Sequence, residues 1–87
     1  MTEHPFVLLT QNDCPNCERL KKMLSGPLRN AYQGSIRVVH REEQAEEFTT
    51  LADLHGIQSV PTLIHATGAV LRNTGGLGEV KLFLERF

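Results

Sequence analysis

The two cysteines of the chain, Cys14 and Cys17, are the residues whose type and spacing most directly indicate chemistry. They stand in the motif Cys14-Pro15-Asn16-Cys17. Residues three positions apart on a helix share one face, and their Cα atoms then lie within the ~4.4–6.8 Å that a disulfide tolerates. The pair can therefore form and break a disulfide with little movement of the backbone, which favours redox chemistry over an inert role.

The two thiols are expected to differ in reactivity. Pro15 suits the first position of a helix, so that Cys14 lies at or just before the helix start. Unpaired backbone N–H groups and the helix dipole stabilise an anion there, and thiol pKa values fall from ~8.5 to about 3.5–7.5 at such positions. Asp13 acts in the opposite direction, because a neighbouring carboxylate raises the pKa of a thiol. Cys17 lies one turn into the helix, on its apolar stripe, and is expected to be more buried.

These positions assign separate roles to the two cysteines. Cys14 is the expected nucleophile, which attacks a disulfide and forms a mixed disulfide. Cys17 is the expected resolving thiol, which displaces the reduced product and leaves an intramolecular bridge. A purely structural bridge fits less well, because closing four residues stabilises a fold by only roughly 2 kcal/mol, against ~4.7 kcal/mol for a loop of a hundred residues.

A structural zinc site is also disfavoured. Such a site needs four ligands, and the chain has only two thiols. The four histidines lack the tight second pair of a zinc finger or ribbon; they are His4, His40, His55 and His65. We therefore expect no bound metal. Because we see no export signal before the motif, we expect the reducing cytoplasm, where cysteine pairs are usually catalytic or metal-binding.

Length and charge limit the remaining possibilities. The chain of 87 residues allows one domain, over residues 1–87. A net charge of −1 provides no overall field for nucleic acid or for an acidic membrane surface. No apolar run approaches the ~20 residues that cross a bilayer. We expect a monomer that binds neither nucleic acid nor membrane.

Apolar periodicity predicts an α/β domain. The predicted elements are a strand over Phe6 to Leu9, a helix from the cysteine motif to Leu24, a further helical piece from Leu28 to Tyr32, a strand over Ile36 to His40, a helix over Glu42 to His55, strands over Thr62 to His65 and Ala69 to Arg72, and a last helix after Gly75-Gly76. The main order is β-α-β-α-β-β-α, a four-stranded mixed sheet flanked by helices. The acids from Glu42 to Glu47 are interpreted as a solvated helix face, and His55 and His65 as structural.

The cysteine motif after a first strand, together with Gly56-Ile57-Gln58-Ser59-Val60-Pro61-Thr62-Leu63, resembles the thioredoxin superfamily. Tyr32-Gln33-Gly34 and Gly68-Ala69-Val70 extend the resemblance over nearly the whole chain from Thr10. It implies a thioredoxin-like domain with a cis bond between Val60 and Pro61, in a loop that faces the cysteines. It also implies that the backbone at Val60 pairs with an extended target segment. The substrate-binding residues implied are Asp13, Pro15, Asn16, Ser59, Val60, Pro61, Gly75 and Gly76.

Some features resemble glutaredoxins more closely. Only 13 residues precede Cys14, which is similar to the minimal, glutaredoxin-like thioredoxin fold. Gly75-Gly76 resembles the Gly-Gly with which glutaredoxins bind glutathione, although a turn and helix N-cap is the simpler interpretation. Gln11 stands where glutaredoxins commonly have Lys, and Asn16 where they have an aromatic residue. The glutathione-binding residues implied are Gln11, Val60, Gly75 and Gly76.

The combined resemblance is to the small redoxins of bacteria, archaea and phages. It implies a dithiol–disulfide oxidoreductase, an electron carrier that reduces a disulfide-containing target protein; ribonucleotide reductase is one candidate target. Such a protein holds no bound cofactor and is recharged by a thioredoxin reductase with NADPH. Three alternatives stay open: a glutathione-coupled glutaredoxin, a metal-binding or iron–sulfur module that shares cysteines between two chains, and an adaptor that uses the fold only for docking.

Overall fold

The computed structural model describes residues 5–29, 31–32 and 34–87, and its elements follow the predicted order. They are β1 (Phe6–Thr10), α1 (Pro15–Ser25), β2 (Ile36–His40), α2 (Ala45–His55), β3 (Thr62–His65), β4 (Val70–Leu71) and α3 (Leu77–Arg86). His4 and Gln33, which entered the sequence argument, lie outside the described residues.

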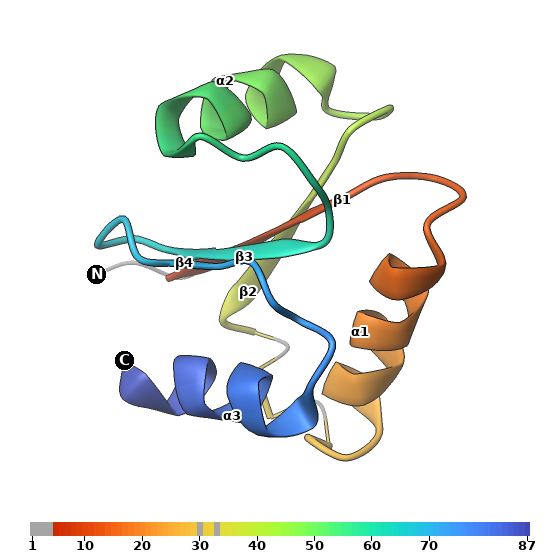
Figure 1. Ribbon diagram of the computed structural model, residues 1–87, viewed down its shortest axis with the longest axis vertical. Helices are drawn as coiled ribbons and strands as arrows, with labels where there is room; N and C mark the ends of the chain where they lie inside the picture. Colours follow the sequence, from red (N-terminus) through yellow and green to blue (C-terminus); the bar gives the residue numbers. More distant parts are fainter. Residues whose placement is uncertain (1–4, 30, 33) are drawn as a thin grey trace.

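The four strands form one mixed sheet in the order β2-β1-β3-β4. β1 pairs in parallel with β2, and β3 pairs antiparallel with both β1 and β4. Helix α2 covers one face of the sheet, and α1 and α3 cover the other (Figure 1). The predicted β-α-β-α-β-β-α architecture is therefore confirmed.

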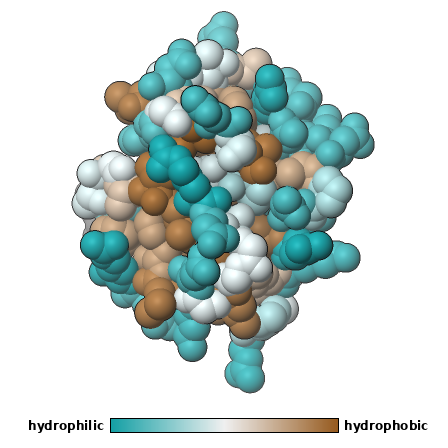
Figure 2. Space-filling view, viewed as in Figure 1, coloured by the Kyte–Doolittle hydropathy of each residue, from teal (hydrophilic) through white to brown (hydrophobic). Residues whose placement is uncertain are grey.

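The central strand, β1, contributes side chains to the cores on both faces of the sheet. Phe6 and Leu8 belong to a cluster that α1 and α3 cover. Leu9 belongs to a second cluster, which includes Phe48 of α2. Because successive side chains of a strand point to opposite faces, a strand buried on both faces has an unbroken apolar run, as this segment does. Hydrophilic residues predominate along the rim of the molecule in the space-filling view, with apolar residues between them (Figure 2).

The structure corrects the bounds of two predicted helices. Helix α2 begins at Ala45 and not at Glu42, since the segment from Arg41 to Gln44 forms a turn. The further helical piece from Leu28 to Tyr32 does not form; its described residues are turns. Arg29 has a φ of 53°, a left-handed conformation that interrupts any helix of L-residues.

The predicted strands also change slightly. β1 continues to Thr10, one residue beyond the predicted end, and β4 is reduced to Val70–Leu71. The turn before β4 contains Gly68 at a φ of 97°, a conformation that glycine adopts without steric cost. In the described part of the chain, no helix combines the length and the apolar character needed to cross a membrane.

Aromatic side chains pack at the edge of the core beside the end of α3. The ring of His65 stacks on that of Phe87, with centroids 3.8 Å apart and planes 12° from parallel. Phe6 contacts both rings edge-on. His65 therefore has the structural role that was expected of it.

We predict that Leu9→Ala lowers the free energy of unfolding by about 2–5 kcal/mol, because Leu9 is fully buried beneath α2 and its loss leaves a cavity. Leu54→Ala is the matched control, since Leu54 lies on α2 itself but is 72% exposed. Its effect on the free energy of unfolding should stay within about 0.5 kcal/mol. Urea unfolding followed by circular dichroism measures both. Equal effects for the two variants would contradict the assignment of the second cluster.

Candidate active site

Cys14 and Cys17 form a disulfide at the start of α1, with their Cα atoms 5.2 Å apart. Cys14 is the N-cap residue of the helix and has an extended backbone, and Pro15 occupies the first helical position. The backbone carbonyl of Cys14 accepts the first hydrogen bond of the helix, from Glu18 N–H at 3.1 Å. The predicted position of Cys14 at the helix start is confirmed.

The Sγ atom of Cys14 caps the helix. It accepts a hydrogen bond from the backbone N–H of Cys17, with an N–S distance of 3.1 Å. The N–H of Cys17 is one of the helix-start donors that have no partner within the helix, and this contact supplies one. Cys17 is fully buried, whereas Cys14 is half-buried. Cys14 is thus the more accessible of the two residues, and the predicted difference in burial is confirmed.

The loop between β1 and α1 is tied to the loop between β2 and α2. The backbone N–H of Asn12 donates to Glu42 Oε1 at 2.8 Å. Arg41 N–H donates to the carbonyl of Thr10 at 2.9 Å, and the Arg41 guanidinium donates to Gln11 Oε1 at 3.1 Å. These three bonds fix the segment that leads to Cys14. The sequence suggested that Glu42 belongs to a solvated helix face. It instead lies before α2 and accepts a hydrogen bond from the loop that leads to Cys14.

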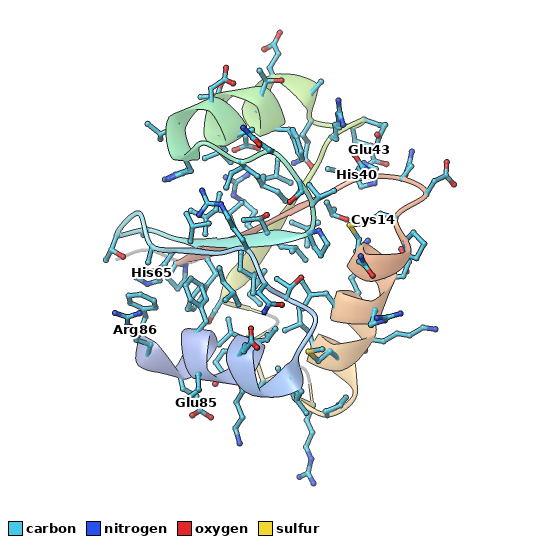
Figure 3. The ribbon with its side chains drawn as sticks, in the orientation of Figure 1. Cys14, His40, Glu43, His65, Glu85 and Arg86 are labelled. Carbon is cyan, nitrogen blue, oxygen red and sulfur yellow. A yellow bond between two sulfur atoms is a disulfide. The ribbon has the colours of Figure 1, made fainter. Side chains whose placement is uncertain are left out.

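Two further features belong to this end of the sheet. Asp13, directly before Cys14, has a φ of 53°, a left-handed conformation that Asp tolerates better than most residues. His40, the last residue of β2, has its Nδ1 atom 3.3 Å from Glu42 Oε1. The ring is mostly buried, and Figure 3 shows it at the same end of the sheet as Cys14, whereas His65 lies at the opposite end.

The loop before β3 provides the second part of the site. The peptide bond between Val60 and Pro61 is cis, as the resemblance to thioredoxins implied. Pro61 is buried, Val60 is half-buried and Ser59 is exposed. The carbonyl of Ser59 accepts a hydrogen bond from the hydroxyl of Thr62 at 2.8 Å, and Thr62 is itself fully buried. The loop is thus anchored on one side and open on the other.

Two hollows flank this loop, and Ser59 and Val60 line both of them. The first, of about 420 Å³, we call the α1-side hollow; its wall includes Asn16, Arg19, Pro61, Arg72 and Gly75. The second, of about 470 Å³, we call the α2-side hollow; its wall includes Gln11, Arg41, Phe48 and Asp53. The start of α1 and the Val60–Pro61 loop therefore share an opening.

The hollows bring together most of the predicted binding residues. Asn16, Ser59, Val60, Pro61 and Gly75 line the α1-side hollow. Gln11 lies across the loop, in the α2-side hollow. Asp13 and Pro15 are exposed beside the disulfide but line neither hollow. The sequence did not single out Arg41 or Arg72 as site residues, although each is a cation within a few residues of a predicted strand or helix end.

Gly76 is the N-cap residue of α3 and has an extended backbone. A Cβ atom placed on it would lie 3.5 Å from Glu79 Oε1, so that an acidic side chain already approaches this helix start. The simpler interpretation of Gly75-Gly76, a turn and an N-cap, describes this geometry. Within residues 5–29, 31–32 and 34–87, no three His, Cys, Asp or Glu side chains lie close enough together to hold a metal ion.

Comparisons with known proteins place the fold. No protein-family model and no curated protein matches the chain. A solved structure matches it: the holo form of glutaredoxin C1 from Populus tremula x tremuloides, at 24% sequence identity and a TM-score of 0.57. The match covers 95% of this chain and 76% of that chain. The chain therefore has the minimal thioredoxin fold in its glutaredoxin-like form.

We predict that Glu42→Ala releases the loop that leads to Cys14, whereas Glu43→Ala does not. Both variants lose one exposed negative charge, but only Glu42 bonds Asn12 N–H. In Glu42→Ala the Asn12 amide should exchange its hydrogen faster, and unfolding should require about 0.5–1.5 kcal/mol less. Glu42→Gln keeps an acceptor oxygen and should keep the protection. NMR hydrogen exchange tests this, and equal protection of Asn12 in the two alanine variants would refute it.

Proposed function

We propose that the protein is a dithiol–disulfide oxidoreductase that reduces disulfides in target proteins. The observation that carries the proposal is the Cys14–Cys17 disulfide at the start of α1, where Cys14 Sγ accepts the N–H of Cys17. The glutaredoxin-like fold supports it, since the structural neighbour is a glutaredoxin. The Val60–Pro61 loop, which shares an opening with the start of α1, supplies a place for the target.

The reaction begins with the reduced protein. The Cys14 thiolate attacks one sulfur of the target disulfide; a bond forms between that sulfur and Cys14 Sγ, and the other target sulfur leaves as a thiolate that takes up a proton. Cys17 then loses its proton, and its sulfur attacks Cys14 Sγ. The mixed disulfide breaks, the second target thiol leaves, and Cys14–Cys17 is formed. Two electrons have moved from the protein to the target.

The burial of the two sulfurs fits this order of events. Cys14 is half-buried, at the start of the helix whose Asn16 and Arg19 line the α1-side hollow. Cys17 is fully buried behind it and becomes the attacker only after Cys14 has reacted. Their Cα separation of 5.2 Å in the disulfide lies within the ordinary range for such a bridge. Docking of an extended target against the exposed side of the loop at Ser59 and Val60 would hold the mixed disulfide during this second step.

We propose a thioredoxin reductase with NADPH as the source of electrons. The glutathione alternative is supported by one observation: Arg19 and Arg72 line the α1-side hollow together with Gly75, and both cations attract carboxylates, although Arg72 Nη2 already donates to the carbonyl of His55 at 3.0 Å. Glu79 at the start of α3 opposes it, because its carboxylate approaches Gly76. An iron–sulfur module would require a second chain, since one chain supplies only two thiols.

We predict that Cys17→Ser accumulates mixed disulfides on Cys14 when it is incubated with a disulfide-containing protein. The serine cannot resolve the intermediate, so that turnover should fall to near the uncatalysed rate. Cys14→Ser, the matched control, should form no mixed disulfide at all. Mass spectrometry of the alkylated proteins distinguishes the two variants. Undiminished turnover by Cys17→Ser would exclude the two-cysteine mechanism.

A second prediction concerns the electron donor. The oxidised protein should be reduced rapidly by a thioredoxin reductase with NADPH. Glutathione that supplies the same concentration of reducing equivalents should reduce it slowly. NADPH consumption, measured with and without glutathione reductase, follows the two routes. Faster reduction by glutathione would instead establish the glutaredoxin alternative.

The iron–sulfur alternative has its own test. Protein purified without oxygen should be colourless, and a bound cluster would contradict the proposal.

A further inference from the structure

We propose that the α2-side hollow is a specificity site, in which Arg41 binds a carboxylate side chain of the target polypeptide close to the cysteine that Cys14 attacks. The proposal rests on the proposed function, because it concerns which disulfides the same site prefers. It specifies the kind of target that the site prefers, which is an extended, acidic segment of a protein. Arg41, the Val60 backbone and the apolar wall of the hollow are the parts that recognise it.

Arg41 is held in place before any target arrives. Its backbone N–H donates to the carbonyl of Thr10, and its guanidinium donates to Gln11 Oε1 at 3.1 Å. The guanidinium also lies over the ring of Phe48, 5.9 Å from the ring centroid. A side chain that is already fixed loses less rotamer freedom on binding, and a guanidinium has five N–H donors, of which Gln11 uses one.

The charge of Arg41 is also uncompensated. Over the residues that the structure describes, no carboxylate forms an ion pair with it. Arg37, on the same strand–helix unit, differs: it contacts Glu47 at 2.6 Å, and this side-chain hydrogen bond raises the pKa of Arg37 and lowers that of Glu47. Glu42, next to Arg41 in sequence, already accepts the N–H of Asn12. Arg41 is therefore the cation available to a ligand at this hollow.

The position of the hollow relates Arg41 to the docking loop. Ser59 and Val60 line it, so that a strand paired with the Val60 backbone passes its mouth. An extended segment advances about 3.3 Å per residue. Gln11, which accepts the hydrogen bond of the Arg41 guanidinium, stands three residues before Cys14, and we therefore assign to Arg41 a carboxylate within one or two residues of the attacked cysteine. Phe48, Ala52 and Ile57 contribute apolar surface to the same wall, beside the polar side chains of the hollow.

The wall of the hollow also contains one acidic residue, whose effect on the preference for acidic targets should be opposite to that of Arg41. Asp53 of α2 lines the same hollow and repels a carboxylate that Arg41 attracts. Removing the positive charge should therefore weaken the preference for acidic targets, and removing the negative charge should strengthen it. A change that merely loosened the loop would not produce opposite effects.

The experiment uses two pairs of oxidised peptides, each closed by one disulfide. The members of a pair differ only in Glu or Gln beside the first cysteine, on its amino side in one pair and on its carboxyl side in the other. The measured quantity is the ratio of kcat/KM for the Glu peptide to that for the Gln peptide, at low salt. The wild-type protein is compared with Arg41→Gln, Arg41→Lys, Asp53→Asn and the control Lys22→Gln, whose residue is exposed on α1 and lines neither hollow.

For one of the pairs, the wild-type ratio should be about threefold to tenfold, the range of a partly exposed charge-assisted hydrogen bond. It should fall to about one in Arg41→Gln, survive in part in Arg41→Lys, rise in Asp53→Asn and stay unchanged in Lys22→Gln. It should also shrink at high salt, which screens exposed charges.

Two results would overturn the proposal: equal rates for Glu and Gln in both pairs, or a preference that persists in Arg41→Gln. If the wild-type protein reduces none of the four peptides, the oxidoreductase function itself fails, and the two failures are thereby distinguished.

Discussion

The central position of β1 in the sheet is the constraint on which the rest of the structure depends. The strand is hydrogen-bonded to β2 on one side and to β3 on the other, and its side chains enter the cores on both faces. Its carboxyl end is therefore fixed in space. Only residues 11–14 separate that end from the first residue of α1. Cys14 must therefore lie near the carboxyl ends of the parallel strands β1 and β2. Cys14, which is half-buried, is thus positioned by a strand of which four of the five residues are buried.

At the start of α1, the Sγ atom of Cys14 has both a structural role and a proposed chemical role. Helix starts leave backbone N–H groups without partners, and here Cys14 Sγ accepts one of them. The atom that completes the helix is also the atom proposed to attack the target. Cys14 is in turn reached through a loop with three hydrogen bonds to the β2–α2 turn. The site therefore consists of a rigid helix start and two loops that are each anchored, at Thr62 and at Glu42.

The sequence predicted what depends on periodicity and on short spacing. The apolar runs of the strands, the apolar stripes of the helices and the short turn between β3 and β4 predicted the element order. The place of Cys17 on the apolar stripe of α1 predicted that it is more buried than Cys14. The cis bond before Pro61 followed only from the resemblance, because X–Pro bonds are mostly trans. The tie between Asn12 and Glu42 joins residues thirty positions apart, and nothing local to either residue indicates it. The same contact, with the turn that holds it, explains why α2 begins later than its acidic residues suggested.

The stack of His65 on Phe87 has a consequence for how such a chain can evolve. It closes the end of the sheet opposite to the one that holds Cys14 (Figure 3). The aromatic cluster around it and the residues that surround the disulfide are thus largely separate sets. Substitutions around the disulfide need not disturb this packing, and substitutions in the packing need not disturb the disulfide. The two ends of the sheet can therefore accumulate changes independently on one scaffold.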